Sequence, residues 1–410
     1  MTHASPSRFH ATHDAAAAPA VVAVLHIAAL PAPELHAVVI VPVKDEAENL
    51  SRTLAALATQ QDLQGQSLPI GFFEVIVLAN NCHDQSAAVA RRFADAHPHL
   101  VLHVVEMTLP PAEAHIGRAR RLLMDEACRR LELVNSATGF IASTDGDTEV
   151  APTWLAATLA ELTTYRAAAV CGRILTPPRP TSCPVRRYHL RDAAYRLLQA
   201  RLEAELDPSP GDPWPRHHQH FGASFAITVA AYRRVGGLPV VPYLEDEALY
   251  QALRRHDLRV RHSPAVRVFT SDRQEGRVAV GLSWQLREWA VLSVQQQEPL
   301  VAGVPCLVAA LEVRRQLRHF WQATRPAEPT EIIPATQTQS IAEIASTLGV
   351  SAVSLTLRVH QAAAFGELWE WVEHSLLTKA SWTQQWPPVP LSEAVSELRR
   401  LLSLTTTAKP

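Results

Sequence analysis

The residues of this chain whose types and spacing best suit ligand binding or catalysis are two acids separated by one glycine, Asp145-Gly146-Asp147. They follow an apolar run at residues 140–144 that predicts a buried strand. A strand that ends in carboxylates directs hard oxygen ligands from the carboxyl edge of a sheet, where open α/β folds bind ligands. Such oxygens suit Mg²⁺ or Mn²⁺, ions that usually accompany a diphosphate, and the glycine allows close approach of the backbone. The alternative is a solvated turn after a strand.

Alternating strand-like and helix-like segments would position these acids. Apolar, often β-branched runs predict strands at residues 36–43, 72–79, 100–106, 140–144, 167–175, 221–228 and 259–269. Helical spacing of apolar residues predicts helices at residues 50–58, 85–97, 116–133, 154–165, 185–206, 230–237 and 244–256. This order indicates the α/β class, with a mainly parallel central sheet and flanking helices. Residues 1–35 are predicted to form a mobile N-terminal tail, and residues 281–410 a helical C-terminal region.

Composition narrows the class of protein. The chain has 410 residues, of which 47% are hydrophobic and 19% charged, as is ordinary for a globular enzyme. The formal net charge of -2 does not indicate that the protein binds nucleic acid. No run of about 18 apolar residues predicts a membrane span. The five cysteines are scattered and odd in number, which indicates free thiols in a reducing compartment, and we therefore expect a cytoplasmic protein.

Four motifs occur in order at the predicted strand ends and at one helix start. They are Val41-Pro42-Val43-Lys44-Asp45-Glu46, Asn80-Asn81-Cys82-His83-Asp84, Asp145-Gly146-Asp147 and Glu245-Asp246. With the strands that carry them, residues 36 to about 280 resemble a family 2 glycosyltransferase with the A-type nucleotide-sugar fold. The resemblance implies a nucleotide-diphospho-sugar transferase fold in a catalytic domain of residues 36–280. It also implies a UDP- or GDP-sugar as donor and an unidentified hydroxyl as acceptor.

The resemblance further implies which residues bind the nucleotide. Pro42, Val43 and Glu46 would border the base, and Asn80 and Asp84 would contact it from the next strand end. Asn80 stands where a carboxylate is common in the family, which leaves the choice of base open. Glu46 has an alternative role as a favourable charge at a helix start, and Asp84 as a helix N-cap.

Two further donor residues follow from the same resemblance. Arg120 belongs to a basic segment with Arg118 and Arg121 and would lie at the diphosphate, because a guanidinium suits phosphate oxygens. At least one arginine of this segment must face solvent, since a helix cannot direct all three inward. Gly222 lies in a segment that would line the pocket for the donor sugar and the acceptor.

The resemblance assigns the reaction to the two acidic motifs. Asp145 would belong to the ribose or metal shell, and Asp147 would bind Mg²⁺ or Mn²⁺, which stabilises charge on the leaving diphosphate. Asp246 would be the general base of a single, inverting displacement, with Glu245 as its substitute. Repulsion with Glu247 is expected to raise one pKa in this cluster. The structural alternative is an acidic helix start.

Three other segments leave their roles open. His262 would be a metal ligand in some relatives, and packing is its alternative. The histidines of residues 217–220 are too close in sequence to converge on one zinc ion. The loop at residues 270–277 would close over the diphosphate or serve as a connector.

Two other functions compete with sugar transfer. A nucleotidyltransferase would carry a glycine-rich basic loop after the first strand, where this chain has Lys44-Asp45-Glu46. A catalytically silent binding protein would be favoured by the loss of Asp147 or Asp246, and both are present. The tryptophan-rich region at residues 281–410 is expected to pack on the catalytic domain, flank the acceptor side or form a homodimer contact.

Overall fold

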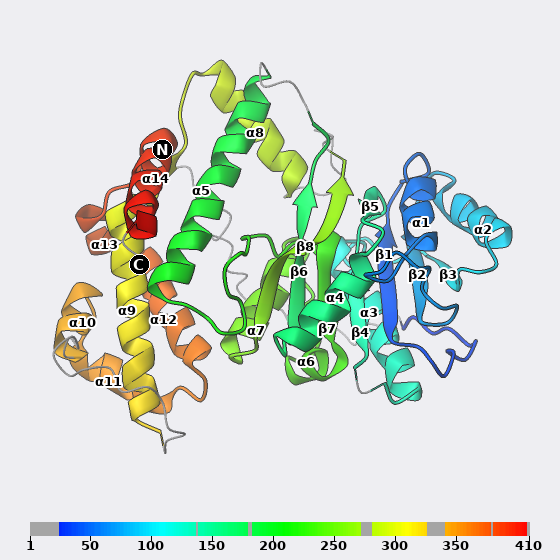
Figure 1. Ribbon diagram of the computed structural model, residues 1–410, viewed down its shortest axis with the longest axis horizontal. Coiled ribbons are helices and arrows are strands. Elements are labelled where there is room, and N and C mark those ends of the chain that lie inside the picture. Colours follow the sequence, from blue (N-terminus) through cyan, green and yellow to red (C-terminus); the bar gives the residue numbers. More distant parts are fainter. Residues whose placement is uncertain are drawn as a thin grey trace.

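A computed structural model describes residues 24–407, apart from residues 137, 179–182, 272–280, 326–340 and 379. In this described part, the centre of the protein is an eight-stranded sheet with the order β3-β2-β1-β4-β7-β6-β8-β5 (Figure 1). The strands are β1 (Ala37–Val43), β2 (Phe73–Asn80), β3 (Leu102–Met107), β4 (Phe140–Ser143), β5 (Thr148–Val150), β6 (Ala169–Leu175), β7 (Phe225–Thr228) and β8 (Val260–Thr270). Six of these strands run in one direction, whereas β5 and β7 run in the other. The predicted mainly parallel sheet is confirmed.

Helices cover both faces of the sheet because successive strand residues point to opposite sides. Val38 and Ile40 of β1 pack with α3, α6 and α7, whereas Val39 and Val41 pack with α1, α2 and α4. The helices are α1 (Leu50–Ala58), α2 (Ser86–Ala96), α3 (Ile116–Leu133), α4 (Trp154–Thr164), α6 (Val229–Arg234) and α7 (Glu245–Arg255). A single turn of 3-10 helix, η1 (Gly222–Ser224), precedes β7 where a longer strand was predicted.

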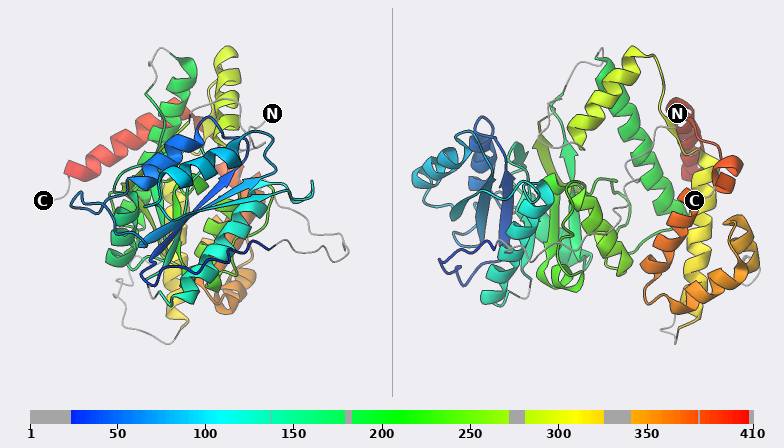
Figure 2. Two further views of the ribbon diagram at one scale, coloured as in Figure 1. Left: turned by 90° about the vertical axis from the view of Figure 1, so that its right-hand side faces the viewer. Right: turned by 180° about the vertical axis from the view of Figure 1, so that it is seen from behind.

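The C-terminal region is helical, as predicted. It comprises α8 (Leu282–Val294), β9 (Leu300–Val301), α9 (Val304–Ala323), α10 (Ile341–Thr347), α11 (Ala352–Gln361), α12 (Phe365–Thr378), α13 (Ala380–Gln385), β10 (Val389–Pro390) and α14 (Leu391–Thr407). The long helix α5 (Pro184–Leu206) lies between the sheet and the helices α9 and α14 (Figures 1 and 2). Its apolar residues pack with α9 and α14. Trp369 is buried in a separate core of α9 to α12, so this aromatic residue packs between helices.

Residues 24–35 differ from the mobile tail that the sequence predicted. Leu25, Ile27 and Leu35 are buried in the core that contains α3. Glu126 of α3 accepts a hydrogen bond from the Ile27 amide at 2.9 Å, and Arg130 donates to the Ala29 carbonyl at 2.6 Å. This segment is therefore part of the hydrophobic core around α3, while residues 1–23 of the predicted tail lie outside the described residues.

Within the described ranges, no single helix is long and apolar enough to cross a membrane. The helices α10 and α11 reach the required length and apolar content only as a pair that is bent by 111°. All five cysteines carry free thiols, in agreement with the prediction from their spacing.

Candidate active site at the carboxyl edge of the sheet

The predicted donor residues come together at one edge of the sheet. Pro42 and Val43 are the last residues of β1, and Asn80 is the last residue of β2. Residues 145–147 follow β4, which pairs with β1 in parallel. Because parallel strands place their carboxyl ends at a common edge, these three segments meet there. The arrangement is the one that the sequence motifs required.

The glycine of the acidic turn is packed against the end of β1. A Cβ atom on Gly146 would lie 3.3 Å from Val43 Cγ2 and 3.3 Å from Glu46 Cγ. Thr53 donates a hydrogen bond to the Gly146 carbonyl at 3.0 Å. A larger residue would have to displace its neighbours, so the turn between Asp145 and Asp147 is held close to the predicted base-binding residues.

Arg120 connects the two acidic motifs of the site. Its side chain is buried and donates to Asp145 Oδ1 at 2.6 Å and, through its other terminal nitrogen, to Glu245. Gly222 lies directly on the guanidinium, because a Cβ atom at this position would be 2.3 Å from Arg120 Nη1. Four segments that are distant in sequence, including η1, therefore meet around one arginine.

The other two arginines of the basic segment face elsewhere. Arg118 pairs with Glu113 at 2.8 Å. Arg121 pairs with Asp125 at 2.7 Å and donates to the carbonyls of Gly236 and Leu238. Of the three candidates, Arg120 is the one that reaches the acidic motifs.

Asp246 lies in the first turn of α7 and faces the Gly222 segment. Its Oδ2 atom accepts a hydrogen bond from the Gly222 amide at 2.7 Å, and its Oδ1 atom accepts one from the Glu247 amide at 2.8 Å. These amides hold the carboxylate in a fixed orientation. Glu245 is engaged by Arg120 and only 3% exposed, so this predicted substitute base is enclosed by its ion pair.

The three adjacent acids have separate partners, and this alters the expected pKa pattern. Burial alone would raise the pKa of Glu247, but the hydrogen bond and charge of His220, 2.5 Å away, hold it below its ordinary value. The pKa of Asp145 is raised. Partial burial of its carboxylate and the nearby carboxylates of Asp246 and Glu46 raise this pKa, against the opposing charge of Arg120.

The loop after β2 is braced by Asp84. Its carboxylate accepts hydrogen bonds from the Ala47 amide at 2.9 Å and from the amide and hydroxyl of Ser86 at 2.9 and 2.5 Å. These bonds lower the pKa of Asp84, although burial opposes the shift. The alternative role as a helix N-cap does not hold, because Gln85 is the N-cap residue of α2. Asp84 instead closes the loop before this helix.

Asn80 and Glu46 are better placed than Asp84 to contact a ligand. Asn80 is 6% exposed, and its Oδ1 atom has no hydrogen-bond partner among the described residues. Glu46 is also buried; its carboxylate accepts from the Asn49 side chain at 3.1 Å. Because a buried, unpaired oxygen is costly, Asn80 offers an acceptor that a nucleotide base could satisfy.

Asp45 belongs to the first motif, but the sequence assigns it no role. It has a positive φ of 53° and accepts a hydrogen bond from the His83 amide at 2.6 Å. That bond and the charge of Lys44 lower the pKa of Asp45 to about 2, although partial burial opposes this. Ligand atoms of Asp45, Cys82 and Asp84 lie within 4.8 Å of one another. Since both carboxylates already accept backbone amides, loop closure explains this grouping.

The histidines at residues 217–220 contact different partners. His217 lies 3.1 Å from the Ser263 carbonyl, and His220 lies against Glu247. His262 approaches Asp212 at 2.8 Å through Nδ1. In the part of the chain with described coordinates, the histidines form no group of three that could share a metal.

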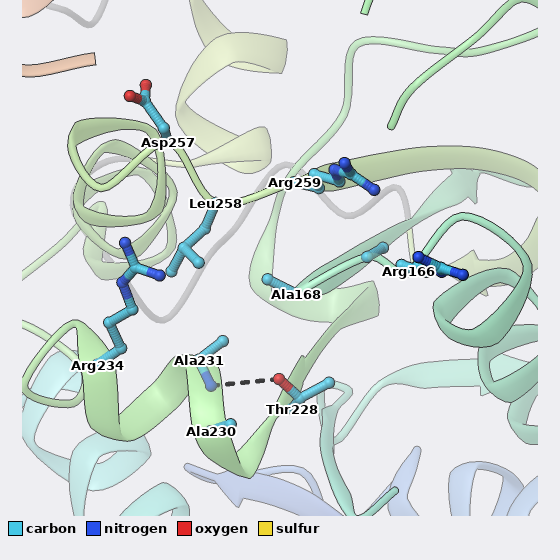
Figure 3. A pocket seen from close by; sticks show the side chains of 10 residues that line it. Arg166, Ala168, Thr228, Ala230, Ala231, Arg234, Asp257, Leu258 and Arg259 are labelled. Atoms are coloured by element: carbon cyan, nitrogen blue, oxygen red, sulfur yellow. Dashed lines mark hydrogen bonds between the residues drawn. The ribbon is translucent and has the colours of Figure 1, made fainter. Parts of the chain in front are cut away.

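One cavity lies at the other edge of the sheet. It has a volume of about 410 Å³ and is lined by residues before β6 and β8 and by α6 (Figure 3). Arg166, Arg234 and Arg259 border it, but they lie at the amino ends of β6 and β8 or after β7. The cavity is therefore separate from the acidic edge.

Comparison with known proteins decides the family. Residues 38–211 match the profile of Glycosyl transferase family 2. This part of the chain belongs to glycosyl transferase family 2. The matched residues include β1, the loop after β2, Arg120 and Asp145–Asp147, so the resemblance inferred from the motifs is confirmed. The matched region spans less than half of the 410 residues. No curated protein sequence matches the chain.

Several solved structures are similar to this chain at a low level. The mannosyltransferase PcManGT from Pyrobaculum calidifontis, in complex with GDP-Man and Mn²⁺, is 18% identical, with a TM-score of 0.42 over 90% of this chain and 87% of that one. S. aureus TarS 1-349 in complex with UDP is 14% identical, with a TM-score of 0.40 over 83% of this chain and 88% of that one. The same fragment with UDP-GlcNAc is 15% identical, with a TM-score of 0.41 over 84% and 92%. Sequence identities of 14–18% do not assign a role to any residue of this chain.

The residues at the acidic edge fit a divalent cation. The negative charges of Asp246 and Glu46 act on Asp145, and the positive charge of Arg120 opposes them there. Arg120 occupies Asp145 Oδ1, and 37% of the Asp145 side chain remains exposed. A set of carboxylate oxygens with excess negative charge is the donor set that Mg²⁺ and Mn²⁺ prefer. The predicted closing loop cannot be placed beside it, because residues 272–280 lie outside the described residues.

Proposed function

We propose that this glycosyltransferase transfers a sugar from a UDP- or GDP-sugar to an acceptor hydroxyl, with inversion and with the help of Mg²⁺ or Mn²⁺. The observation that supports this most is the double contact of Arg120 with Asp145 and Glu245. It joins the strand-end acids of the donor side to the helix that carries Asp246. Donor and acceptor chemistry can therefore occur at one place.

On the donor side, Pro42, Val43 and Glu46 would border the base, and Asn80 would contact it. Asp84 would support this surface by bracing the loop. Asp147, with Asp145 beside it, would hold the cation, which supplies Lewis-acid stabilisation of the diphosphate when bound. Arg120 would add positive charge close to the phosphates.

On the acceptor side, Asp246 would remove the proton from the attacking hydroxyl. The amides of Gly222 and Glu247 orient its carboxylate, so the base needs little reorganisation before it acts. The hydroxyl oxygen would attack the anomeric carbon while the bond to the diphosphate breaks on the opposite side. A single displacement of this kind inverts the anomeric configuration.

The domain division and the setting of the enzyme are also proposals. Residues 36–280 would contain every group that contacts the donor, and residues 281–410 would contribute none. The free thiols support a reducing, cytoplasmic setting. A contact within a homodimer remains one of the roles proposed for the C-terminal region.

The test is a thermal-shift experiment with UDP- and GDP-sugars, each with Mn²⁺ or with EDTA. One nucleotide series should stabilise the protein in Mn²⁺ and lose that effect in EDTA. Asp147→Asn should lose it too, whereas the matched control Glu149→Gln should keep it, because Glu149 is exposed and pairs only loosely with Arg52 at 3.9 Å. Equal stabilisation of the Asp147 variant would contradict the metal assignment.

A further inference from the structure

The C-terminal region is docked on the helix that carries the proposed base. A Cβ atom on Gly366, at the start of α12, would lie 1.7 Å from the Arg254 carbonyl near the end of α7. The two helices therefore meet backbone to backbone. Asp257 accepts hydrogen bonds from the amides of Phe365 at 2.6 Å and Gly366 at 2.7 Å, so the turn after α7 satisfies the first amides of α12.

A chain of side-chain hydrogen bonds continues from this contact along α7. Glu373 of α12 accepts from Arg254 at 3.2 and 3.4 Å, and Arg254 donates to Gln251 at 3.1 Å. Gln251 donates to Glu247 at 2.6 Å. These α7 residues are three and four positions apart, so they lie on one face of the helix. Trp369 donates to Glu373 at 2.7 Å and fixes its carboxylate.

The chain ends at the acidic first turn of α7. Glu247 contacts His220 at 2.5 Å, and its amide donates to Asp246 Oδ1 at 2.8 Å. The His220 ring stacks on Tyr250, with ring centroids 4.1 Å apart, and the Arg254 guanidinium lies over the Tyr250 ring at 5.8 Å. Both routes from Arg254 reach the residue beside Asp246.

We propose that Glu373 is a positioning residue for sugar transfer, which fixes the acidic turn of α7 from the C-terminal region. This inference rests on the proposed role of Asp246. Glu373 reaches the turn through Arg254, Gln251 and Glu247 and touches no reacting atom. Since a misplacement of about 1 Å at a reacting group can cost about 10²-fold in rate, a contact that sets the position of α7 affects turnover.

The experiment compares three variants of the full chain. Glu373→Ala removes the acceptor of Arg254, and Glu373→Gln keeps an acceptor oxygen. Glu370→Ala is the matched control: it removes a contact of the same helix with Arg255, at 2.6 and 2.7 Å, that does not continue to Gln251. The measured reaction is hydrolysis of UDP-glucose, UDP-GlcNAc and GDP-mannose in Mn²⁺, in which water replaces the acceptor. Donor affinity and hydrogen–deuterium exchange of residues 244–256 are measured in parallel.

Glu373→Ala should lower kcat about 10-fold to 100-fold, leave donor affinity unchanged and speed exchange in the first turn of α7. Glu373→Gln should restore most of the rate, and Glu370→Ala should stay within about twofold of wild type. Wild-type kcat and exchange in Glu373→Ala would overturn the inference, as would an equal loss in Glu370→Ala. Asp246→Asn separates the two proposals: if it hydrolyses donor at the wild-type rate, the proposed base is wrong, whereas exchange in α7 still reports on Glu373.

Discussion

Replacing Arg120 by methionine should destabilise the protein strongly, although Arg120 belongs to the active site. The guanidinium is 4% exposed and separates Glu245, which is 3% exposed, from Asp145. Removal of one partner from a buried ion pair typically costs about 3–5 kcal/mol, because the remaining charge stays buried without compensation. Asp145 is more than one-third exposed, so solvent screens its share, and we expect a loss near the lower value, about 3 kcal/mol.

The assay is urea denaturation followed by circular dichroism, with two companion variants. Arg118→Met is the matched control in the same helical turn; its pair with the half-exposed Glu113 should be worth less than about 1 kcal/mol. Arg120→Met combined with Glu245→Leu should recover most of the loss, because an apolar pair avoids the unpaired buried charge. A loss below about 1 kcal/mol in Arg120→Met, or no recovery in the double variant, would refute the reasoning.

Three further predictions concern the metal, the base and acid stability. Asp147→Ala should abolish Mn²⁺-dependent binding of UDP or GDP without unfolding the protein; unchanged metal-dependent affinity in calorimetry would contradict this. Asp246→Asn should slow transfer about 10²–10⁴-fold with donor affinity nearly unchanged, and a wild-type rate would place the base elsewhere. Burial lowers the pKa of His217 to about 3, so the unfolded chain binds a proton first as the pH falls below about 6.5. His217 should therefore contribute a loss of about 2 kcal/mol in folding stability between that pH and pH 5. His217→Gln should remove this share of the slope in thermal melts and leave the share of the similarly buried His218. A slope unchanged in the variant would show that His217 is not its source.

The strands, and the edge of the sheet at which the acidic residues meet, could be predicted because patterns of neighbouring residues indicate them. Apolar runs identified β1, β2 and β4, and the carboxyl ends of parallel strands necessarily share an edge. The reversal of β7 was not predictable, because the alternation of side chains carries no information on strand direction. The three-residue β5 was missed because it is too short to show a pattern.

Long-range partners explain what the sequence left open at the site. The sequence of α3 cannot distinguish the three arginines of its basic segment from one another. Their ion-pair partners do so, because Glu113 and Asp125 bind two of them away from the acidic motifs. Asp84 fits a helix start and a base contact equally well until its three donors are known. Residues 24–35 look like a tail because the acceptors and donors that hold them lie about one hundred positions later in α3.

The reversed strand β7 has a consequence for how this enzyme could diversify. Because β7 pairs with β4 in antiparallel fashion, the chain enters the sheet at the edge where the other strands of the donor half leave it. In the proposed function, the donor would bind at the strand ends within residues 37–147, and the acceptor at α7 and at the segment that leads into β7. Substitutions or insertions between α5 and β7 would then alter the acceptor side and leave the hydrogen bonds between the donor-side strands intact. Exchange of this single segment between relatives would be a direct route to new acceptor preferences on a constant donor site.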